Sequence, residues 1–398
     1  MKFDFTTIMD RRGKDATAVD AFESRYGVTL KEGFDLLPMW VADMNYPTCP
    51  SILKALQDRI SHPAFGYFAP RDEYFDAIIN WHKTRKGAPD ITRDCIGYEN
   101  GVLGGAATAA MVLGNRGGKI LVHSPTYVGF TGTLLPAGFD LVYSSLVQDE
   151  QGVWRMDFAD MEKKLKEQAI HTAILCSPHN PCGRVWERWE LEQAMELFRK
   201  YDVYVISDEI WSDIILNGHT HIPTQEVSED AKMRTVALYA PTKTFSLAGL
   251  VGSYHVIYNP RLRDLIRKES SLSHYNTLNV LSMHALIGAY SETGAEWVDE
   301  LRQVLSGNIN FACVFLAEHC PEISVFKPEG TYMMYLDCTK WCEKHGKTLD
   351  ELLNAGAEVG VLWQDGRGFH GPCHIRMNLA LPRARVEEAF RRLKEYVL

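Results

Sequence analysis

Four polar residues follow apolar, strand-like runs of the sequence, where side chains able to do chemistry often gather. They are Tyr127 in HSPTYVGF, Asn180 in SPHNPCGR, Asp208 in VISDEIWSD and Lys243 in YAPTKTFSL. A lysine desolvated at the end of a buried strand has a lowered pKa, which makes its amine a nucleophile or a Schiff-base former. A strand-end lysine that reaches solvent is the commoner case, so Lys243 alone establishes no function.

The other three residues have equally ordinary alternatives when each is taken alone. Asp208 could pair with a protonated ring nitrogen, but aspartate also begins helices and turns. The Asn180 amide could donate to a phenolate oxygen, although Asn-Pro is also a common turn signal. Tyr127 could stack on an aromatic ring, or it could be a core tyrosine with a satisfied hydroxyl.

We expect the elements that position these residues to form a sheet covered by helices. Near-continuous apolar runs indicate strands that are buried on both faces, as in parallel or mixed sheets. A helical pattern over 187–202 supplies a crossover between two of them. Ligand chemistry in such sheets gathers at the carboxyl ends of the strands. The predicted strands are 119–125, 171–178, 203–209, 234–242 and 252–258.

The pattern changes after about residue 290. A long helical segment over 295–319 leads into short strands over 322–337, a helix over 347–356, further strands at 359–363 and 374–380, and a final helix from Pro382. This mixture predicts a smaller α+β unit. The first 45 or so residues are irregular and could pack on either part.

Composition limits the class of protein and its partners. The chain has 398 residues, of which 46% are hydrophobic, so it can form a large core; its net charge of −9 is the wrong sign for generic nucleic-acid binding. Its nine cysteines form no C-x-x-C pattern, which favours a reducing, cytoplasmic compartment. The uncharged, apolar-leaning run at 101–114 is too short for a membrane span, which needs about 20 residues, and the charged N-terminus lacks a signal-peptide pattern.

Taken in order, these motifs resemble one enzyme family. A glycine-rich turn, Tyr127, Asn-Pro-x-Gly, Asp-Glu and a strand-end lysine are similar to the pyridoxal-phosphate-dependent class I and II aminotransferase family of fold type I. Four segments resemble its cystathionine β-lyase, or C–S lyase, branch, which includes the maltose-regulon modulator. They are LPMWVADMNYPTCP (37–50), FGYF (65–68), HNPCGRVW (179–186) and SDEIWSDI (207–214).

The resemblance implies an α/β fold in two parts. A large domain over 48–290 would hold a mostly parallel seven-stranded sheet covered by helices. A smaller α+β domain would combine 1–47 with 291–398. The resemblance also implies pyridoxal 5′-phosphate as cofactor and a homodimer with shared active sites.

The resemblance assigns roles to individual residues. Lys243 would form the Schiff base and move the Cα proton, while Asp208 would pair with the ring nitrogen. Asn180 would donate to the ring oxygen and lie beside the substrate carboxylate, and Tyr127 would stack on the ring. Arg376, in HIRMNLA, would bind the substrate α-carboxylate through its planar fork.

The same resemblance predicts how the phosphate is bound. The turn 100–106 would present the amides of Val102 and Leu103 at a helix N-terminus. Thr242 would add a hydroxyl group, and Tyr67 would reach the phosphate of a neighbouring subunit. Trp211 would lie near the cofactor.

Several positions depart from the family pattern. Many aminotransferases have an arginine eight residues after the lysine, where this chain has Val251, as the lyase branch would suggest; the position three before the lysine is Ala240 rather than the frequent serine. The third position after Asp208 is Trp211, whose indole can donate a hydrogen bond but cannot accept one. Cys182 replaces the usual threonine of Asn-Pro-Thr-Gly.

These features predict a C–S β-lyase that cleaves cystathionine or related cysteine S-conjugates to a thiol, pyruvate and ammonia. An aminotransferase is the alternative, because both reactions begin with removal of the same Cα proton. A regulatory binding protein that acts on a transcription activator is an alternative of another class. We expect an amino-acid substrate, no nucleic acid and no membrane partner.

Other residues that could be taken for ligands favour plainer roles. His219, His221 and the pair Cys373 and His374 lack the further ligands that a zinc site needs. Asp43, in the WVADM segment, could either shape a substrate pocket or cap a turn.

Overall fold

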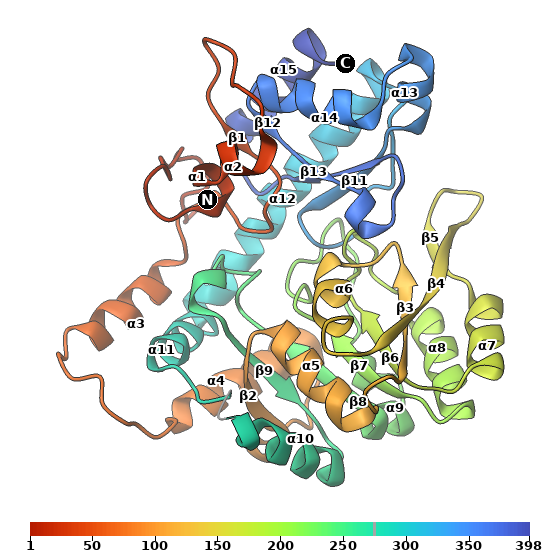
Figure 1. The fold of residues 1–398 in the computed structure, drawn as a ribbon. Helices are drawn as coiled ribbons and strands as arrows, with labels where there is room; N and C mark the ends of the chain where they lie inside the picture. The colour runs from red at the N-terminus through yellow and green to blue at the C-terminus, as the bar shows by residue number, and fades with distance from the viewer. Residues whose placement is uncertain (274–275) are drawn as a thin grey trace.

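A twisted sheet with helices on both faces forms the main body of the protein (Figure 1). The structure is a computed structural model that describes residues 1–273 and 276–398. Within the described residues this sheet has eight strands in the order β2-β9-β8-β7-β6-β3-β4-β5. The strands are β2 (Ile96–Asn100), β3 (Lys119–Ser124), β4 (Asp140–Gln148), β5 (Trp154–Met156), β6 (Ile170–Cys176), β7 (Tyr204–Asp208), β8 (Thr235–Tyr239) and β9 (Gly252–Val256). The predicted α/β class is confirmed.

The central pairs of the sheet are parallel and its outer pairs are antiparallel. Strands β4, β3, β6, β7 and β8 pair in parallel, whereas β9, β2 and β5 pair antiparallel with their neighbours. Seven strands were expected, and the described residues form eight because β4 is longer than β3. The first six residues of β4 pair with β3, and its last three pair with β5.

Alternation along the central strands explains why both faces are covered. In β3, Ile120 and Val122 pack with helices α5 (Val102–Leu113), α6 (Val128–Leu134) and α10 (Pro260–Ser273). Leu121 points to the other face, where α7 (Phe158–Glu167), α8 (Arg188–Lys200) and α9 (Glu229–Arg234) complete a separate core. Both side-chain sets of the strand are therefore apolar, as expected for a buried parallel strand.

A second sheet lies beyond one end of the main sheet (Figure 1). Its order is β10-β11-β14-β13, and all of its pairs are antiparallel. The 28-residue helix α12 (Glu292–His319) runs from the main body to this sheet (Figure 1). The remaining elements of this part are β10 (Ser324–Val325), β11 (Met333–Asp337), β13 (Gln364–Asp365), β14 (His374–Asn378), α13 (Thr339–His345), α14 (Leu349–Glu358) and α15 (Arg383–Tyr396).

The N-terminal segment of the chain packs against the C-terminal part. The short strand β1 (Leu37–Pro38) pairs in parallel with β12 (Val361–Leu362). The predicted domain boundaries at residues 47 and 290 stay a prediction. In the described ranges, no helix has the length and apolar character that crossing a membrane would require. The other α-helices of the described residues are α1 (Thr17–Asp20), α2 (Phe22–Tyr26), α3 (Pro50–Ile60), α4 (Asp72–Trp81) and α11 (Val280–Ala289).

Candidate active site

The strand register brings the predicted site residues to one end of the main sheet. Cys176, the last residue of β6, is the Cα partner of Asp208, the last residue of β7, and Asp208 is in turn the partner of Leu238 in β8. A cavity of about 190 Å³ lies at these strand ends. It is lined by Ala42, Gly101, Val102, Leu103, Tyr127, Cys176, Asn180, Asp208, Ile210, Trp211, Thr242, Lys243, Ala248 and Val251.

Lys243 enters this cavity from the turn that follows β8. Its Nζ atom donates to the carbonyl oxygen of Ala42 at 3.0 Å and lies 6.0 Å from the centre of the Trp211 ring. Burial, together with the nearby positive charge of Arg376, lowers the pKa of Lys243 to about 8. Lys243 is therefore a largely desolvated amine rather than a solvent-exposed surface lysine.

Asp208 is the carboxylate that lines the cavity. Its side chain is 3% exposed, and Oδ1 accepts a hydrogen bond from the amide of Ile210 at 3.1 Å. Burial raises the pKa of Asp208 to about 6. A cationic group in the cavity would stabilise the charged form of this carboxylate, so the site favours a ligand with a protonated nitrogen.

The start of α5 forms one corner of the same cavity, which we call the anion corner because its backbone amides would suit an anion. Gly101 precedes the helix with φ of 88°, a backbone conformation that favours glycine. Val102 and Leu103 are the first residues of the helix, and amides at this position have no partner within the helix. Thr242 and Val251 also line the cavity. The Val251 position therefore supplies no charge, and an anion here would depend on amides and a hydroxyl group.

The ring of Tyr127 occupies space that a side chain on Gly129 would otherwise fill. A Cβ atom on Gly129 would lie 2.3 Å from Cε1 of the Tyr127 ring. Phe130 packs edge-on against the same ring at 5.4 Å between centroids. Tyr127 therefore presents a supported aromatic surface to the cavity, which suits a flat ligand. Together with the carboxylate, the lysine and the anion corner, this surface fits a phosphorylated aromatic aldehyde.

Arg376 reaches the site from β14 of the second sheet. Its Nη1 atom donates to Oδ1 of Asn180 at 3.0 Å, and its Nη2 atom donates to the side-chain oxygen of Gln364 and to the carbonyl oxygen of Trp40. Its guanidinium lies 4.5 Å from the centre of the Phe369 ring. Among the described residues, the buried Nε atom has no hydrogen-bond partner. An incoming carboxylate would satisfy this donor.

Three groups that contact Lys243 or Arg376 were not predicted from sequence. They are the carbonyl oxygen of Ala42, the Gln364 side chain and the Phe369 ring. Gln364 is the Cα partner of Arg376 in the β13–β14 pair. No local motif marks such a partner, because the pairing depends on how two separate strands align.

Tyr67 is the predicted site residue that lies away from the cavity. It belongs to the segment between α3 and α4 and is fully exposed. Phe65 and Phe68 in the same segment are also exposed. The predicted role of Tyr67 requires a second copy of the chain and stays a prediction.

The residues set aside as ligands have structural partners. His221 Nε2 lies 2.8 Å from a buried oxygen of Glu209, and His219 lies 3.8 Å from Glu329. The Sγ atom of Cys373 lies 3.7 Å from the Sγ atom of Cys342. Outside positions 274 and 275, no group of three potential metal ligands comes together.

Asp43 has a partner that was not predicted. Its carboxylate forms a two-point ion pair with Arg11, with Nη2 to Oδ2 at 2.6 Å. The side chain of Asn378 donates to the carbonyl oxygens of Val41 and Asp43. These contacts fix the segment whose Ala42 carbonyl accepts from Lys243.

Comparisons with known proteins agree with this geometry. The sequence model of the family "Aminotransferase class I and II" matches residues 35–393. The cystathionine beta-lyase PatB of Bacillus subtilis is 32% identical over 389 residues, which cover 97% of each chain. The solved structure of a PLP-bound C–S lyase from Staphylococcus hominis superposes with a TM-score of 0.90 at 28% identity, covering 100% of this chain and 99% of that one. Cystalysin from Treponema denticola, solved with pyridoxal 5′-phosphate, gives a TM-score of 0.91 at 27% identity over 99% and 98% of the two chains.

Proposed function

Because the chain belongs to the aminotransferase class I and II family, we propose that it is a pyridoxal 5′-phosphate-dependent C–S β-lyase. Its substrates are cystathionine or related cysteine S-conjugates, which it cleaves to a thiol, pyruvate and ammonia. The observation that carries this proposal is the full-length likeness to a cystathionine β-lyase, to a C–S lyase structure and to cystalysin, around a cavity with the required side chains. Incubation with cystathionine and analysis of the products tests it.

Each part of the cofactor has a matching group in the cavity. The amides of Val102 and Leu103, with the Thr242 hydroxyl, would hold the phosphate. Tyr127 would cover one face of the ring, and Asp208 would hold a proton on the ring nitrogen. Asn180 would contact the ring oxygen and Lys243 would bind the aldehyde carbon. When bound, the cofactor supplies an electron-withdrawing ring that acidifies the Cα–H bond of the amino acid.

The protein's own residues then position the substrate and move its proton. Arg376 binds the α-carboxylate through two guanidinium nitrogens, which fixes the direction of the Cα–H bond. The substrate amine would replace Lys243 on the aldehyde carbon, and the freed Lys243 amine, with a pKa lowered to about 8, would take the Cα proton as a general base. The Cβ–S bond breaks, the sulfur leaves as a thiol after protonation, and the remaining three-carbon fragment is hydrolysed to pyruvate and ammonia.

An aminotransferase is the second candidate, and the name of the matching family favours it. The two reactions share Lys243, Asp208 and Arg376, and they differ in whether the sulfur leaves or a proton returns to the cofactor. The uncharged Val251 beside the anion corner supports the lyase. Ammonia release without an added keto acid supports the lyase, whereas keto-acid-dependent transfer of the amino group supports the aminotransferase.

We also propose a homodimer and a reducing, cytoplasmic compartment. The exposed Tyr67 and its aromatic neighbours support the homodimer, since a second copy would cover them. All nine cysteines lie in the described part of the chain as free thiols, which supports the compartment. The two-domain division at residues 47 and 290 belongs to the same proposal.

A further inference from the structure

Hydrogen bonds within the loop 179–184, which carries Asn180, hold it in a closed turn. Further hydrogen bonds join this loop to the turn at 329–330. The amide of His179 donates to the carbonyl of Arg184 at 2.8 Å, and the amide of Gly183 donates back to His179 at 2.7 Å. The amides of Glu329 and Gly330 both donate to the carbonyl of Gly183, at 2.9 and 3.0 Å. The turn at 329–330 leads directly into β11.

Glycines allow the two backbones to touch at this point. A Cβ atom on Gly183 would lie 2.8 Å from Cβ of Pro328, and one on Gly330 would lie 2.9 Å from Cγ2 of Val185. Gly183 also has φ of 69°, a conformation that favours glycine. The contact therefore leaves no room for a side chain on either glycine.

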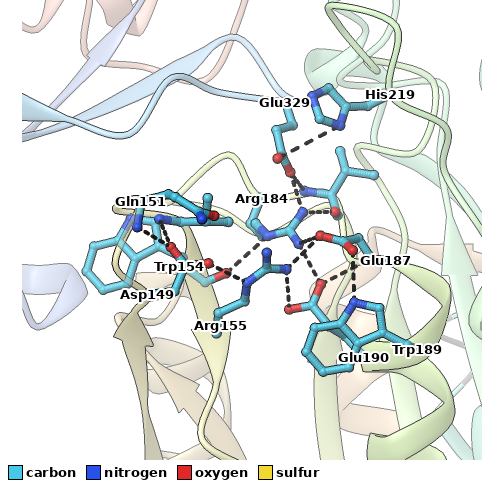
Figure 2. A network of polar contacts seen from close by, with 12 residues as sticks. Asp149, Gln151, Trp154, Arg155, Arg184, Glu187, Trp189, Glu190, His219 and Glu329 are labelled. Carbon is cyan, nitrogen blue, oxygen red and sulfur yellow. Dashed lines mark hydrogen bonds and ion pairs between the residues drawn. The ribbon is translucent and has the colours of Figure 1, made fainter.

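A partly buried ion pair between Arg184 and Glu329 joins the loop to the turn (Figure 2). The Arg184 side chain is 1% exposed, and its Nη1 atom donates to Oε2 of Glu329. The same carboxylate oxygen accepts the amide of Val185 at 3.0 Å. Arg184 also donates to Glu187 at 2.9 Å and to Glu190 at 2.6 Å (Figure 2). Glu190 stays paired with Arg184 when Glu329 is removed, so Glu329 is the member of the network that ties Arg184 to the turn.

The contacts form a closed path that begins and ends at the substrate site. From Glu329 the chain continues into β11, where Tyr335 is the Cα partner of Arg376 in β14. Arg376 donates to Asn180 at 3.0 Å, and Asn180 belongs to the loop that Arg184 closes. Arg184 and Glu329 do not line the cavity. Arg184 and Glu329 nevertheless connect the loop of Asn180 to the sheet that carries Arg376.

We propose that Arg184 and Glu329 are positioning residues that fix the spacing between Asn180 and Arg376, and thereby set the preference for amines that carry an α-carboxylate. This inference rests on the proposed role of Arg376 as the carboxylate-binding residue. A misplacement of about 1 Å in a binding group is enough to lower reactivity substantially, by up to about a hundredfold. A pair that only stabilised the fold would change stability but leave this preference intact.

The test uses the holoenzyme and two probes that differ by the carboxylate alone. L-Alanine has the amine, the carboxylate and no leaving group, and ethylamine is the same molecule without the carboxylate. Dissociation constants come from the change in cofactor absorbance on titration. In E329Q we expect the constant for L-alanine to rise about tenfold while that for ethylamine changes less than about twofold.

The matched control is E187Q, because Glu187 accepts from the same arginine but does not lead into β11. We expect E187Q to keep the wild-type ratio of the two constants. If E329Q keeps that ratio, or if E187Q loses it equally, the positioning role is wrong.

A second variant covers the case in which E329Q does not fold. In G330A the added methyl group would press against Val185 and separate the turn from the loop without changing any charge. We expect the same selective loss for L-alanine, together with faster hydrogen exchange at the amides of 329 and 330. Normal L-alanine binding in folded G330A with exposed amides would overturn the proposal. These readings concern amino-acid binding, so a wild-type protein that binds L-alanine but releases no thiol would contradict the proposed function and leave this test valid.

Discussion

Nη1 of Arg376 donates a hydrogen bond to Oδ1 of Asn180 at 3.0 Å, which joins the second sheet to a loop at the end of the main sheet. The two residues are 196 positions apart in sequence. The substrate site therefore depends on the relative placement of two separate parts of the chain. Asn180 and Gln364 accept from the two Nη atoms of Arg376, and among the described residues its Nε atom is left without a partner.

Replacing Arg376 with lysine tests the carboxylate site. Lysine keeps one positive charge but lacks the planar fork that binds a carboxylate at two points. We expect the KM of R376K for cystathionine to rise about a hundredfold, with a smaller fall in kcat. Steady-state kinetics measure this, and an unchanged KM would show that Arg376 does not bind the carboxylate.

Replacing Lys243 with alanine tests the reactive amine. The buried Lys243 amine is the proposed base for the Cα proton, and removing such a base lowers turnover by at least about a hundredfold. K243A should also lose the absorbance of the lysine-bound cofactor. The exposed Lys163 on α7 offers a control, since K163A removes a lysine that does not line the cavity. Equal activity in K243A and K163A would contradict the assignment.

The pKa of Asp208 predicts a pH-dependent stability. Burial raises this pKa from 3.8 to about 6, so the folded protein disfavours the charged carboxylate. Because the folded-state pKa is the higher one, the wild type loses stability as the pH rises from about 4 to about 6, and the cost is fully present above that range. Each pKa unit corresponds to about 1.4 kcal/mol.

The substitution D208N removes that cost in the cofactor-free protein. We expect D208N to exceed the wild type in free energy of unfolding by about 1 to 3 kcal/mol at pH 8, with a smaller gap at pH 5. Urea unfolding of both cofactor-free proteins measures the gap. The same variant should bind the cofactor more weakly, because the partner of the ring nitrogen is lost. A variant less stable than the wild type at pH 8 would contradict the role of burial.

Much of the main sheet could be predicted because its central strands are continuously apolar. The predicted runs at 171–178 and 203–209 overlap β6 and β7, and they place Asn180 shortly after β6 and Asp208 at the end of β7. By contrast, β2 and β4 were not predicted. Both are partly exposed strands towards the edges of the sheet, so polar residues interrupt their apolar pattern.

The site was predicted where it follows the chain locally and missed where it depends on tertiary pairing. Lys243 and Thr242 follow a recognisable strand, whereas the Gln364 contact arises from the alignment of β13 with β14. The contact between Arg184 and Glu329 joins positions 145 residues apart. Periodicity and motif spacing carry no information on such contacts.

Mixing two inactive variants tests whether active sites are shared. Y67A would lack the group given to a neighbouring site, and K243A would lack the reactive amine of its own site. In a mixed dimer, one site would combine an intact Lys243 with an intact Tyr67. We expect subunit exchange to restore about a quarter of the wild-type activity, because half of the dimers are mixed and each has one complete site. Mixtures of a monomeric enzyme would stay inactive, and so would mixtures of a dimer with independent sites.

The most direct test of the central claim is product analysis with cystathionine as the sole substrate and no added keto acid. The holoenzyme should release thiol, pyruvate and ammonia in equal amounts, because cleavage of one Cβ–S bond yields one of each. Homocysteine is the expected thiol. Amino-group transfer that requires an added keto acid, with no release of ammonia or thiol, would contradict the assignment as a C–S β-lyase.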